Sequence, residues 1–286
     1  MYSWSREYTS SLIDRALWIA GLYLVRVADF DTVLGSQFRV PINKCLNGYA
    51  IDFEANGSNP QVAFLRQYIS DPSVRYEESL IRRFMADFRP RNLQEVLFGQ
   101  QTDYEDDCKA SQLQHYVSSL DITRPFLPMP WSTPSEISRY RQGLKALNGS
   151  LAPDLSPSIV EQESRKEYER LIATYESIKK IGYKPNIASD GALDSRFIQV
   201  VMLRDHEDER FIVMSGHHRL AALSALGWTQ VPAILVANGL PIVDLANVEN
   251  WPVVSEGVYD LHVARRVFKR YFATQTSIPR PAPIPS

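Results

Sequence analysis

The sequence predicts an α+β fold, in which a small mixed-sheet domain follows a mostly helical N-terminal region. Two patterns favour this fold class. Apolar residues recur at helical spacing through much of residues 1–124. Between residues 167 and 236 the pattern changes to a helix, two strands, a tight turn, a helix and a third strand. Helices followed by a compact unit of short strands are typical of an α+β protein.

Changes in composition predict five segments along the chain. The helical region covers residues 1–124, and a proline-rich linker with a short helix covers residues 125–156. The mixed-sheet domain follows at residues 157–250, and a C-terminal helix at 251–275. The tail, residues 276–286, is rich in proline and is predicted to be disordered.

Helices of the first two segments are predicted from N-cap residues and from apolar spacing. One helix is expected to open at Asn59-Pro60, to carry Val62, Leu65 and Ile69 inward, and to end at Asp71-Pro72. The other expected helices are Ser10 or Ser11 to Tyr23, Tyr76 to Phe88, Asn92 to Phe98 and Ser135 to Leu147. Several arginines lie on them, and two interpretations stay open: a solvated face, or a pocket for a phosphate or carboxylate. These arginines are Arg66, Arg82, Arg83, Arg89 and Arg91.

The mixed-sheet domain shows the clearest helical pattern of the chain, over Glu167–Tyr183, which Gly182 ends. Two apolar runs separated by a polar turn then predict a β-hairpin. The remaining predicted elements are the hairpin strands Phe197–Arg204 and Arg210–Met214, a helix between Ser215 and Gly227, a strand over Val231–Val236 and a last helix over Val258–Phe272.

Bulk composition narrows the class of protein. Hydrophobic residues make up 44% of the 286 residues and charged residues 22%, as in soluble globular proteins. The net charge of -2 gives no electrostatic reason to bind nucleic acid, so we do not expect such a partner. The apolar run at residues 16–25 is shorter than the roughly 20 residues of a membrane span. Without a signal peptide or transmembrane segment, a cytoplasmic location is expected.

The two cysteines, Cys45 and Cys108, have no metal-binding spacing and are predicted to be buried thiols. The adjacent pair His217–His218 is poorly spaced for a metal, since neighbouring helix positions diverge by about 100°. No metal ligand is identified, and no pattern sets an oligomeric state.

The most informative segment is the turn Ser215-Gly216-His217-His218-Arg219 between a strand and a helix. A glycine there lets the backbone approach a ligand closely. The first amide groups of the next helix have no intrahelical partner and attract an anion. Two imidazoles and a guanidinium add donors. This combination suits a phosphate group.

The stretch Val213–Ala222, with Leu226-Gly227 and Val231-Pro232 behind it, resembles the core motif of the ParB/sulfiredoxin superfamily. The resemblance covers residues 157–240, and the upstream helix to Gly182 is similar to that fold's preceding helix. ParB-type segregation proteins of this superfamily bind CTP and DNA. Sulfiredoxins place a catalytic cysteine where His217 stands, so their thiol chemistry is not expected.

The turn is most similar to the Gly-His-His-Arg turn of the superfamily's free-serine kinases. This resemblance implies that Ser215, Gly216, His217, His218 and Arg219 bind nucleotide phosphates. It also implies Glu161 as catalytic base, with Glu163 as a nearby alternative, and His218 as a second catalytic residue. The kinases have an aspartate before the glycine. Ser215 replaces it here, which weakens the expectation of a magnesium ligand.

Two functions are therefore expected. The first is a nucleotide-binding phosphotransferase, of kinase type or a nucleotide hydrolase, that acts on a small hydroxylated acceptor. Its nucleotide would be ATP or ADP, or CTP, with Mg²⁺ as the candidate metal. The alternative is a non-enzymatic ParB-like module that binds a nucleotide or DNA. A degenerate domain used as a scaffold is a third interpretation.

Overall fold

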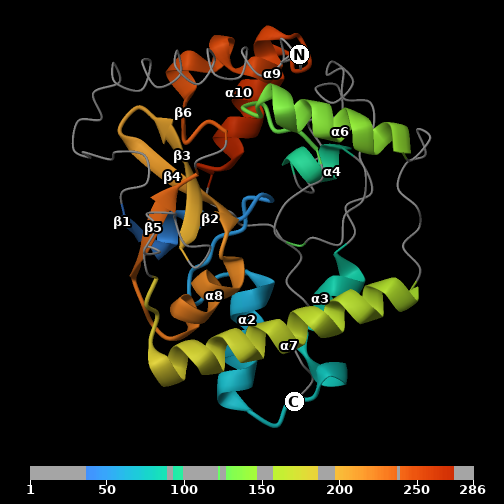
Figure 1. Ribbon diagram of the computed structural model, residues 1–286, viewed down its shortest axis with the longest axis vertical. Coiled ribbons are helices and arrows are strands. Elements are labelled where there is room, and N and C mark those ends of the chain that lie inside the picture. Colours follow the sequence, from blue (N-terminus) through green and yellow to red (C-terminus); the bar gives the residue numbers. More distant parts are fainter. Residues whose placement is uncertain are drawn as a thin grey trace, which may run out of the picture. The chain divides into compact units, whose positions relative to one another are not determined.

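A computed structural model describes residues 37–88, 93–98, 122, 127–146, 157–185, 197–236 and 239–273 (Figure 1). All of these residues belong to one compact unit. The predicted N-terminal helix up to Tyr23, Cys108 and the proline-rich tail lie outside the described residues.

In the described part of the chain, strands form a six-stranded mixed sheet, in the order β1-β5-β3-β4-β2, with β6 also paired to β3. The α+β fold class is confirmed. The strands are β1 (Phe38–Pro41), β2 (Cys45–Leu46), β3 (Ile198–Asp205), β4 (Asp208–Ser215), β5 (Gln230–Leu235) and β6 (Ile242–Asp244).

The predicted hairpin is the antiparallel pair β3 and β4, joined at the turn His206–Glu207. The first half of β3 pairs in parallel with β5, and its second half pairs in parallel with β6. Antiparallel β1 extends the sheet beyond β5, and parallel β2 lies beside β4. Strand β3 is thus hydrogen-bonded along both of its edges.

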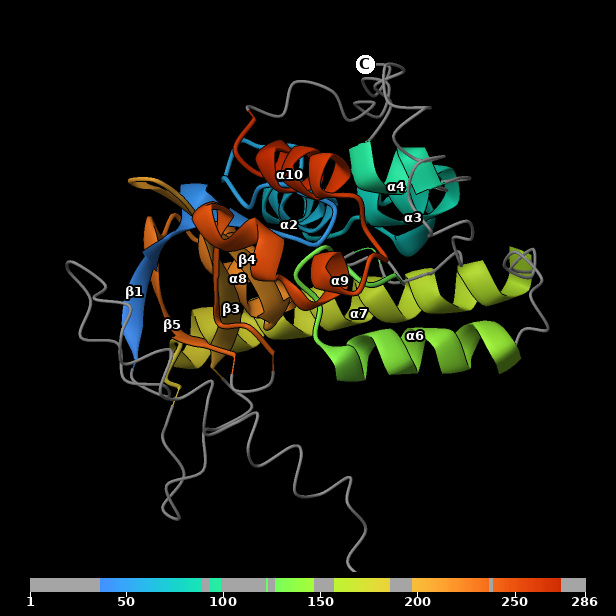
Figure 2. The same ribbon diagram turned by 90° about the horizontal axis from the view of Figure 1, so that it is seen from above.

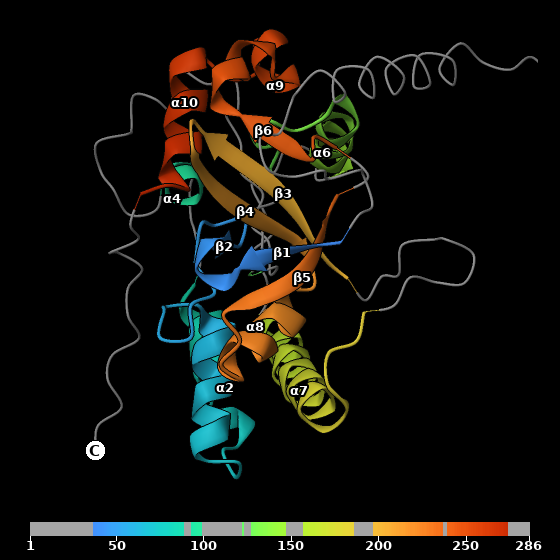
Figure 3. The ribbon, with the colours of Figure 1, turned by 90° about the vertical axis from the view of Figure 1, so that its left-hand side faces the viewer.

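Helices cover both faces of this sheet, as Figure 3 shows in side view. Alternate residues of β3 enter different apolar clusters, because successive side chains of a strand point to opposite faces. Val200 and Met202 pack with residues of α2 (Pro60–Ser70), α3 (Leu80–Asp87), α7 (Pro157–Ile181) and α8 (His217–Ala225). Val201 and Leu203 pack with residues of α4 (Leu93–Phe98), α6 (Pro134–Ala146), α9 (Pro252–Ser255) and α10 (Leu261–Arg270).

The N-terminal helices largely follow their predicted bounds. Helix α2 begins at Pro60, and the Asn59 side chain accepts hydrogen bonds from the amides of its first turn, as predicted. Its residue Ile69 was expected to face inward, but 42% of it is exposed. The helix predicted from Tyr76 is divided into a 3-10 turn, η2 (Tyr76–Glu78), and α3. Ser79 causes the division, because its hydroxyl caps α3.

Helix α7 differs most from its prediction, because it begins at Pro157, ten residues before Glu167. The intervening charged residues stay helical, since ion pairs such as Lys166–Glu163 at spacing three support the exposed face. Gly182 ends the helix with a φ of 76°, as predicted. Figure 2 shows α7 from above as a long helix.

The C-terminal part was predicted as one helix over Val258–Phe272. The structure has α10 in its place, preceded by α9 and by the 3-10 helix η3 (Leu245–Asn250). Trp131 of the proline-rich segment packs edge-on against Trp251 and Phe268. The described residues of that segment therefore form part of the core on this face. None of the described helices combines the length and the hydropathy that crossing a membrane requires.

The N-terminal region contributes more than helices to the sheet domain. Strands β1 and β2 form outer strands of the sheet, and the 3-10 helix η1 (Ile42–Lys44) joins them. Cys45 of β2 is a buried free thiol, as predicted, and burial raises the pKa of its thiol. Residues 37–88 therefore provide the strands that pair with β4 and β5 and the helix α2 that contacts α8.

Candidate functional site

The turn at the end of β4 has the backbone geometry that the sequence predicts. Gly216 is the N-cap of α8 and adopts φ 90° and ψ 21°, in the left-handed region. The pairing of β3 and β4 shifts its register between Gln199 and Val200, opposite this end of β4. Such an irregularity redirects a strand as it leaves a sheet. The chain turns from β4 into α8 within one residue.

Gly216 lies so close to Ile198 of β3 that a side chain would make a tight contact there. A Cβ atom at Gly216 would stand 3.2 Å from the Cα of Ile198 and 3.2 Å from the Nη2 atom of Arg219. The Arg219 guanidinium is therefore close to the turn, at the front of α8. The left-handed φ favours glycine at this position, and the close approach adds to that preference.

The two histidines have different surroundings. His217 is buried, with 8% of its surface exposed, and its ring centre lies 6.2 Å from that of Phe53. His218 is partly exposed, and its Nε2 atom lies 2.8 Å from Oε2 of Glu167 on α7. The predicted phosphate-binding role of His217 and of Ser215, which ends β4 with partial exposure, stays a prediction.

Glu167 is the carboxylate that the structure brings to this turn. Its side chain is only 13% exposed, and it accepts a second hydrogen bond of 2.7 Å from Nε2 of Gln61 on α2. Burial by itself raises the pKa of Glu167. His218, Gln61 and the charge of Arg170 outweigh burial, so that the pKa of Glu167 lies below its ordinary value.

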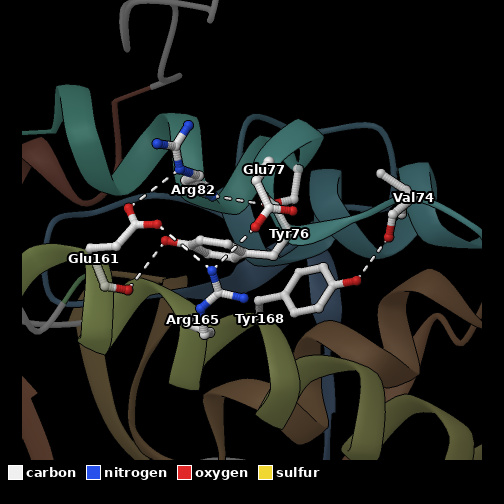
Figure 4. A network of polar contacts seen from close by, with 8 residues as sticks. Val74, Tyr76, Glu77, Arg82, Glu161, Arg165 and Tyr168 are labelled. Atoms are coloured by element: carbon white, nitrogen blue, oxygen red, sulfur yellow. Dashed lines mark hydrogen bonds and ion pairs between the residues drawn. The ribbon is translucent and has the colours of Figure 1, made fainter.

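Glu161 was expected just before a helix, but it lies within α7, and its predicted role as catalytic base stays a prediction. Its carboxylate pairs with Arg82 of α3 at 3.3 Å, and Arg165 is 3.9 Å away (Figure 4). Six residues separate Glu161 from Glu167, which corresponds to about 9 Å along a helix axis. The contacts of Glu161 therefore join α7 to α3.

The network around Glu161 attaches the segment between α2 and α3 to α7. The Arg165 guanidinium lies 4.1 Å from the centre of the Tyr76 ring and also pairs with Glu77 (Figure 4). The Tyr76 hydroxyl donates to the backbone oxygen of Glu161, and the Tyr168 hydroxyl donates to that of Val74. These contacts orient the N-terminal helices over α7.

Of the arginines proposed as an anion pocket, Arg66 donates to the backbone oxygen of Ala55, and Arg82 pairs with Glu161. Arg89 and Arg91 lie outside the described residues. Arg66 and Arg82 thus contact different groups, which favours the interpretation of these arginines as a solvated face. Within the described ranges, no group of three or more His, Cys, Asp or Glu side chains could hold a metal ion.

Glu167, Gln61 and Phe53 were missed by the sequence prediction. A signal for Glu167 exists, because it stands four residues before Leu171 and eight before Tyr175, on the buried stripe of the helix. A carboxylate on an apolar stripe requires a polar partner. Gln61 and Phe53 carry no comparable signal, since their proximity to α8 arises only from the tertiary structure.

Comparisons with known proteins agree with this architecture. The family model of the ParB N-terminal domain matches residues 153–250. A nucleoid occlusion protein of Bacillus cereus (strain AH187) is 28% identical over 109 residues, which cover 32% of this chain and 37% of that protein. This chain thus spans little more than a third of the relative's length. No solved structure matches the chain.

These matches correct one expectation. The net charge of -2 argued against nucleic acid as a partner, whereas a ParB N-terminal domain and a nucleoid occlusion protein are what this chain is similar to. A charge summed over 286 residues says little about any one surface, so it did not justify excluding nucleic acid.

We expect Gly216→Ala to lower the free energy of unfolding by about 2–3 kcal/mol, from left-handed strain plus overpacking against β3. Gly182→Ala is the matched control, because Gly182 is also left-handed but has no atom within 4 Å of an added Cβ. It should lose only about 1 kcal/mol. Urea unfolding measures both, and equal losses would contradict the close approach at Gly216.

We expect Glu167→Gln to lower stability at neutral pH by about 1–3 kcal/mol, because it leaves a buried hydrogen-bond network incomplete. The folded-state pKa of Glu167 is lowered, so its contribution is present above the ordinary value of 4.5 and is lost as pH falls through the folded value. The difference between wild type and variant should therefore shrink in acid. Glu161→Gln, at an exposed ion pair, should change stability by less than about 1 kcal/mol. Urea midpoints across pH check this, and a pH-independent difference would refute it.

Proposed function

Since residues 153–250 form a ParB-like domain, we propose that this chain is a ParB-like module that binds a nucleotide through its phosphates at the front of α8. ATP, ADP and CTP are the candidate nucleotides. The observation that carries the proposal is Gly216, which turns the chain so that the first amides of α8 and the Arg219 guanidinium gather at one point.

Binding has more support than phosphate transfer. A transferase of the expected type needs a carboxylate base near the turn. Glu161 is paired with Arg82, and Glu167 accepts hydrogen bonds from Gln61 and His218. Both carboxylates are therefore engaged within the protein. The ParB-like match favours the non-enzymatic interpretation for the same turn.

This turn has few side chains that could bind a metal ion. Ser215 stands where the similar kinases have an aspartate, and Glu167 is engaged in hydrogen bonds. Mg²⁺ would then be held chiefly by the nucleotide's own phosphates and by water. Mg²⁺ is accordingly a variable in the experiment below.

Isothermal titration of the full chain with ATP, ADP and CTP, with and without Mg²⁺, tests the proposal. We expect at least one of them to bind, and Arg219→Gln to weaken binding by about tenfold or more, because a charge-assisted hydrogen bond is lost. Arg66→Gln is the matched control, because Arg66 donates to the backbone oxygen of Ala55. This variant should bind the nucleotide as wild type does. Absence of binding by all three nucleotides would exclude the proposal, and transfer or hydrolysis would favour the enzyme.

DNA is a second proposed ligand, and the similarity to a nucleoid occlusion protein favours it. The surface of α10 is not the proposed site. Its Lys269 pairs with Asp205, Arg265 pairs with Glu249, and the partly buried Arg270 donates to the backbone oxygens of Val96 and Tyr49. These basic side chains already have partners within the protein, whereas a DNA-binding surface needs basic side chains that contact phosphates.

We expect a DNA duplex to bind the full chain with an affinity that falls steeply with salt. Three phosphate contacts imply about a fortyfold loss between about 50 and about 200 mM salt. Fluorescence anisotropy with a labelled duplex measures this, with and without ATP or CTP. Salt-independent binding, or no binding at the lowest salt, would argue against DNA.

A further inference from the structure

A pocket lies at the end of the sheet away from α8, where the parallel strands β3 and β6 finish side by side. Arg204 of β3 is paired in register with Asp244 of β6. In open α/β sheets, ligands bind beyond the carboxyl ends of the strands. The volume of this pocket is about 340 Å³, and small-molecule sites measure roughly 300–1,000 Å³. Its lining residues are His206, Asp244, Leu245, Ala246 and Arg265.

This pocket is distinct from the turn into α8. Ser215, beside that turn, is paired with Gln199 near the start of β3, whereas His206 follows Asp205, the last residue of β3. The length of strand from Gln199 to Asp205 spans about 20 Å. Figure 3 shows the carboxyl end of β3 beside α10, and α8 at the other end of the sheet. The pocket and the proposed nucleotide site are therefore separate.

One wall of the pocket carries a carboxylate that can still accept a hydrogen bond. Asp244 is partly exposed, and its Oδ1 atom accepts a hydrogen bond of 2.9 Å from the amide of Ala246. Nη1 of Arg204 is 3.9 Å from Oδ2 of Asp244, which is too long for a hydrogen bond. The contact with Ala246 thus fixes the side chain, while Oδ2 can accept from an ammonium group.

The opposite charge comes from α10. Arg265 lines the pocket and pairs with Glu249 at 3.7 Å, and both side chains are more than half exposed. An exposed ion pair at this distance contributes little, because water screens both charges. A ligand carboxylate can therefore replace Glu249 as the partner of the guanidinium, whose planar fork matches a carboxylate.

These walls restrict the charge of the ligand. Asp205, beside the pocket, is already engaged by Lys269 and by Nδ1 of His206. A dianion would meet the carboxylate of Asp244, and a diamine would meet the guanidinium of Arg265. A molecule with one ammonium and one carboxylate complements both side chains. Leu245 and Ala246 offer apolar contact to the rest of such a molecule.

We propose that this pocket binds a free amino acid with an apolar side chain. Its ammonium group donates to Asp244 and its carboxylate accepts from Arg265. Binding is reversible, and no covalent bond forms or breaks. This site lies outside the proposed nucleotide function and does not depend on it.

The test is saturation-transfer NMR of the full chain, titrated with L-leucine and with L-valine. Two analogues of leucine keep its apolar body and lose one charge: isocaproate lacks the ammonium group, and isopentylamine lacks the carboxylate. We expect at least one amino acid to bind with a Kd of about 1 mM or tighter, and each analogue to bind about tenfold more weakly or worse than leucine.

Two variants with matched controls locate the site. Asp244→Asn keeps a side-chain cap but removes the charge, and its control is Asp260→Asn, because Asp260 accepts from the amide of His262 in the same way. Arg265→Gln is compared with Arg141→Gln, an exposed arginine of α6 that does not line the pocket. We expect each pocket variant to weaken amino-acid binding by about tenfold or more, and each control to bind as wild type does.

Three results would overturn the proposal: no binding by either amino acid, equal binding by leucine and one of its analogues, or equal affinity in a pocket variant and its control. Nucleotide binding is measured separately by calorimetry, so that either proposal can fail while the other stands.

Discussion

The structure depends on strand β3, which is hydrogen-bonded along both edges and covered on both faces. It pairs with β4 on one side and with β5 and β6 on the other, and its alternate side chains enter two apolar clusters. Because β3 is fixed in this way, its backbone at Ile198 is a rigid surface beneath Gly216. The turn into α8 passes close to β3 at Ile198, and the Arg219 guanidinium lies beside the same turn.

Two carboxylates on α7 illustrate how burial determines the role of a charge. Glu161 is about half exposed and forms ion pairs of the kind that contribute little to stability in water. Glu167 is nearly buried, where an unpaired charge would be costly, and its partners must therefore be in place. The pair of Glu167 with His218 links α7 to the front of α8, and Gln61 adds α2 to the same network. Residues outside the matched range 153–250 thus help to form the site inside it.

The proposed function rests on this geometry and on the similarity of one domain. The proposed anion site combines a left-handed glycine, the start of helix α8 and a nearby guanidinium, whereas the carboxylates that could assist transfer are engaged elsewhere. The similarity to a ParB N-terminal domain and to a nucleoid occlusion protein is the reason for proposing a nucleotide and DNA as ligands.

The sequence by itself determined the elements whose causes are local. The caps at Asn59 and Gly182, the hairpin β3–β4, the helix α8 and the glycine at its start were predicted because each depends on a few neighbouring residues. Only the tertiary structure decided what depends on distant partners. The short strands β1 and β2 have too few residues to show a strand pattern in the sequence. They are strands because β1 pairs with the distant β5 and β2 pairs with the distant β4. The choice of Glu167 over Glu161 at the turn was likewise decided by the packing of α7 on α8 and α2, since two carboxylates on one helix differ only in what they face.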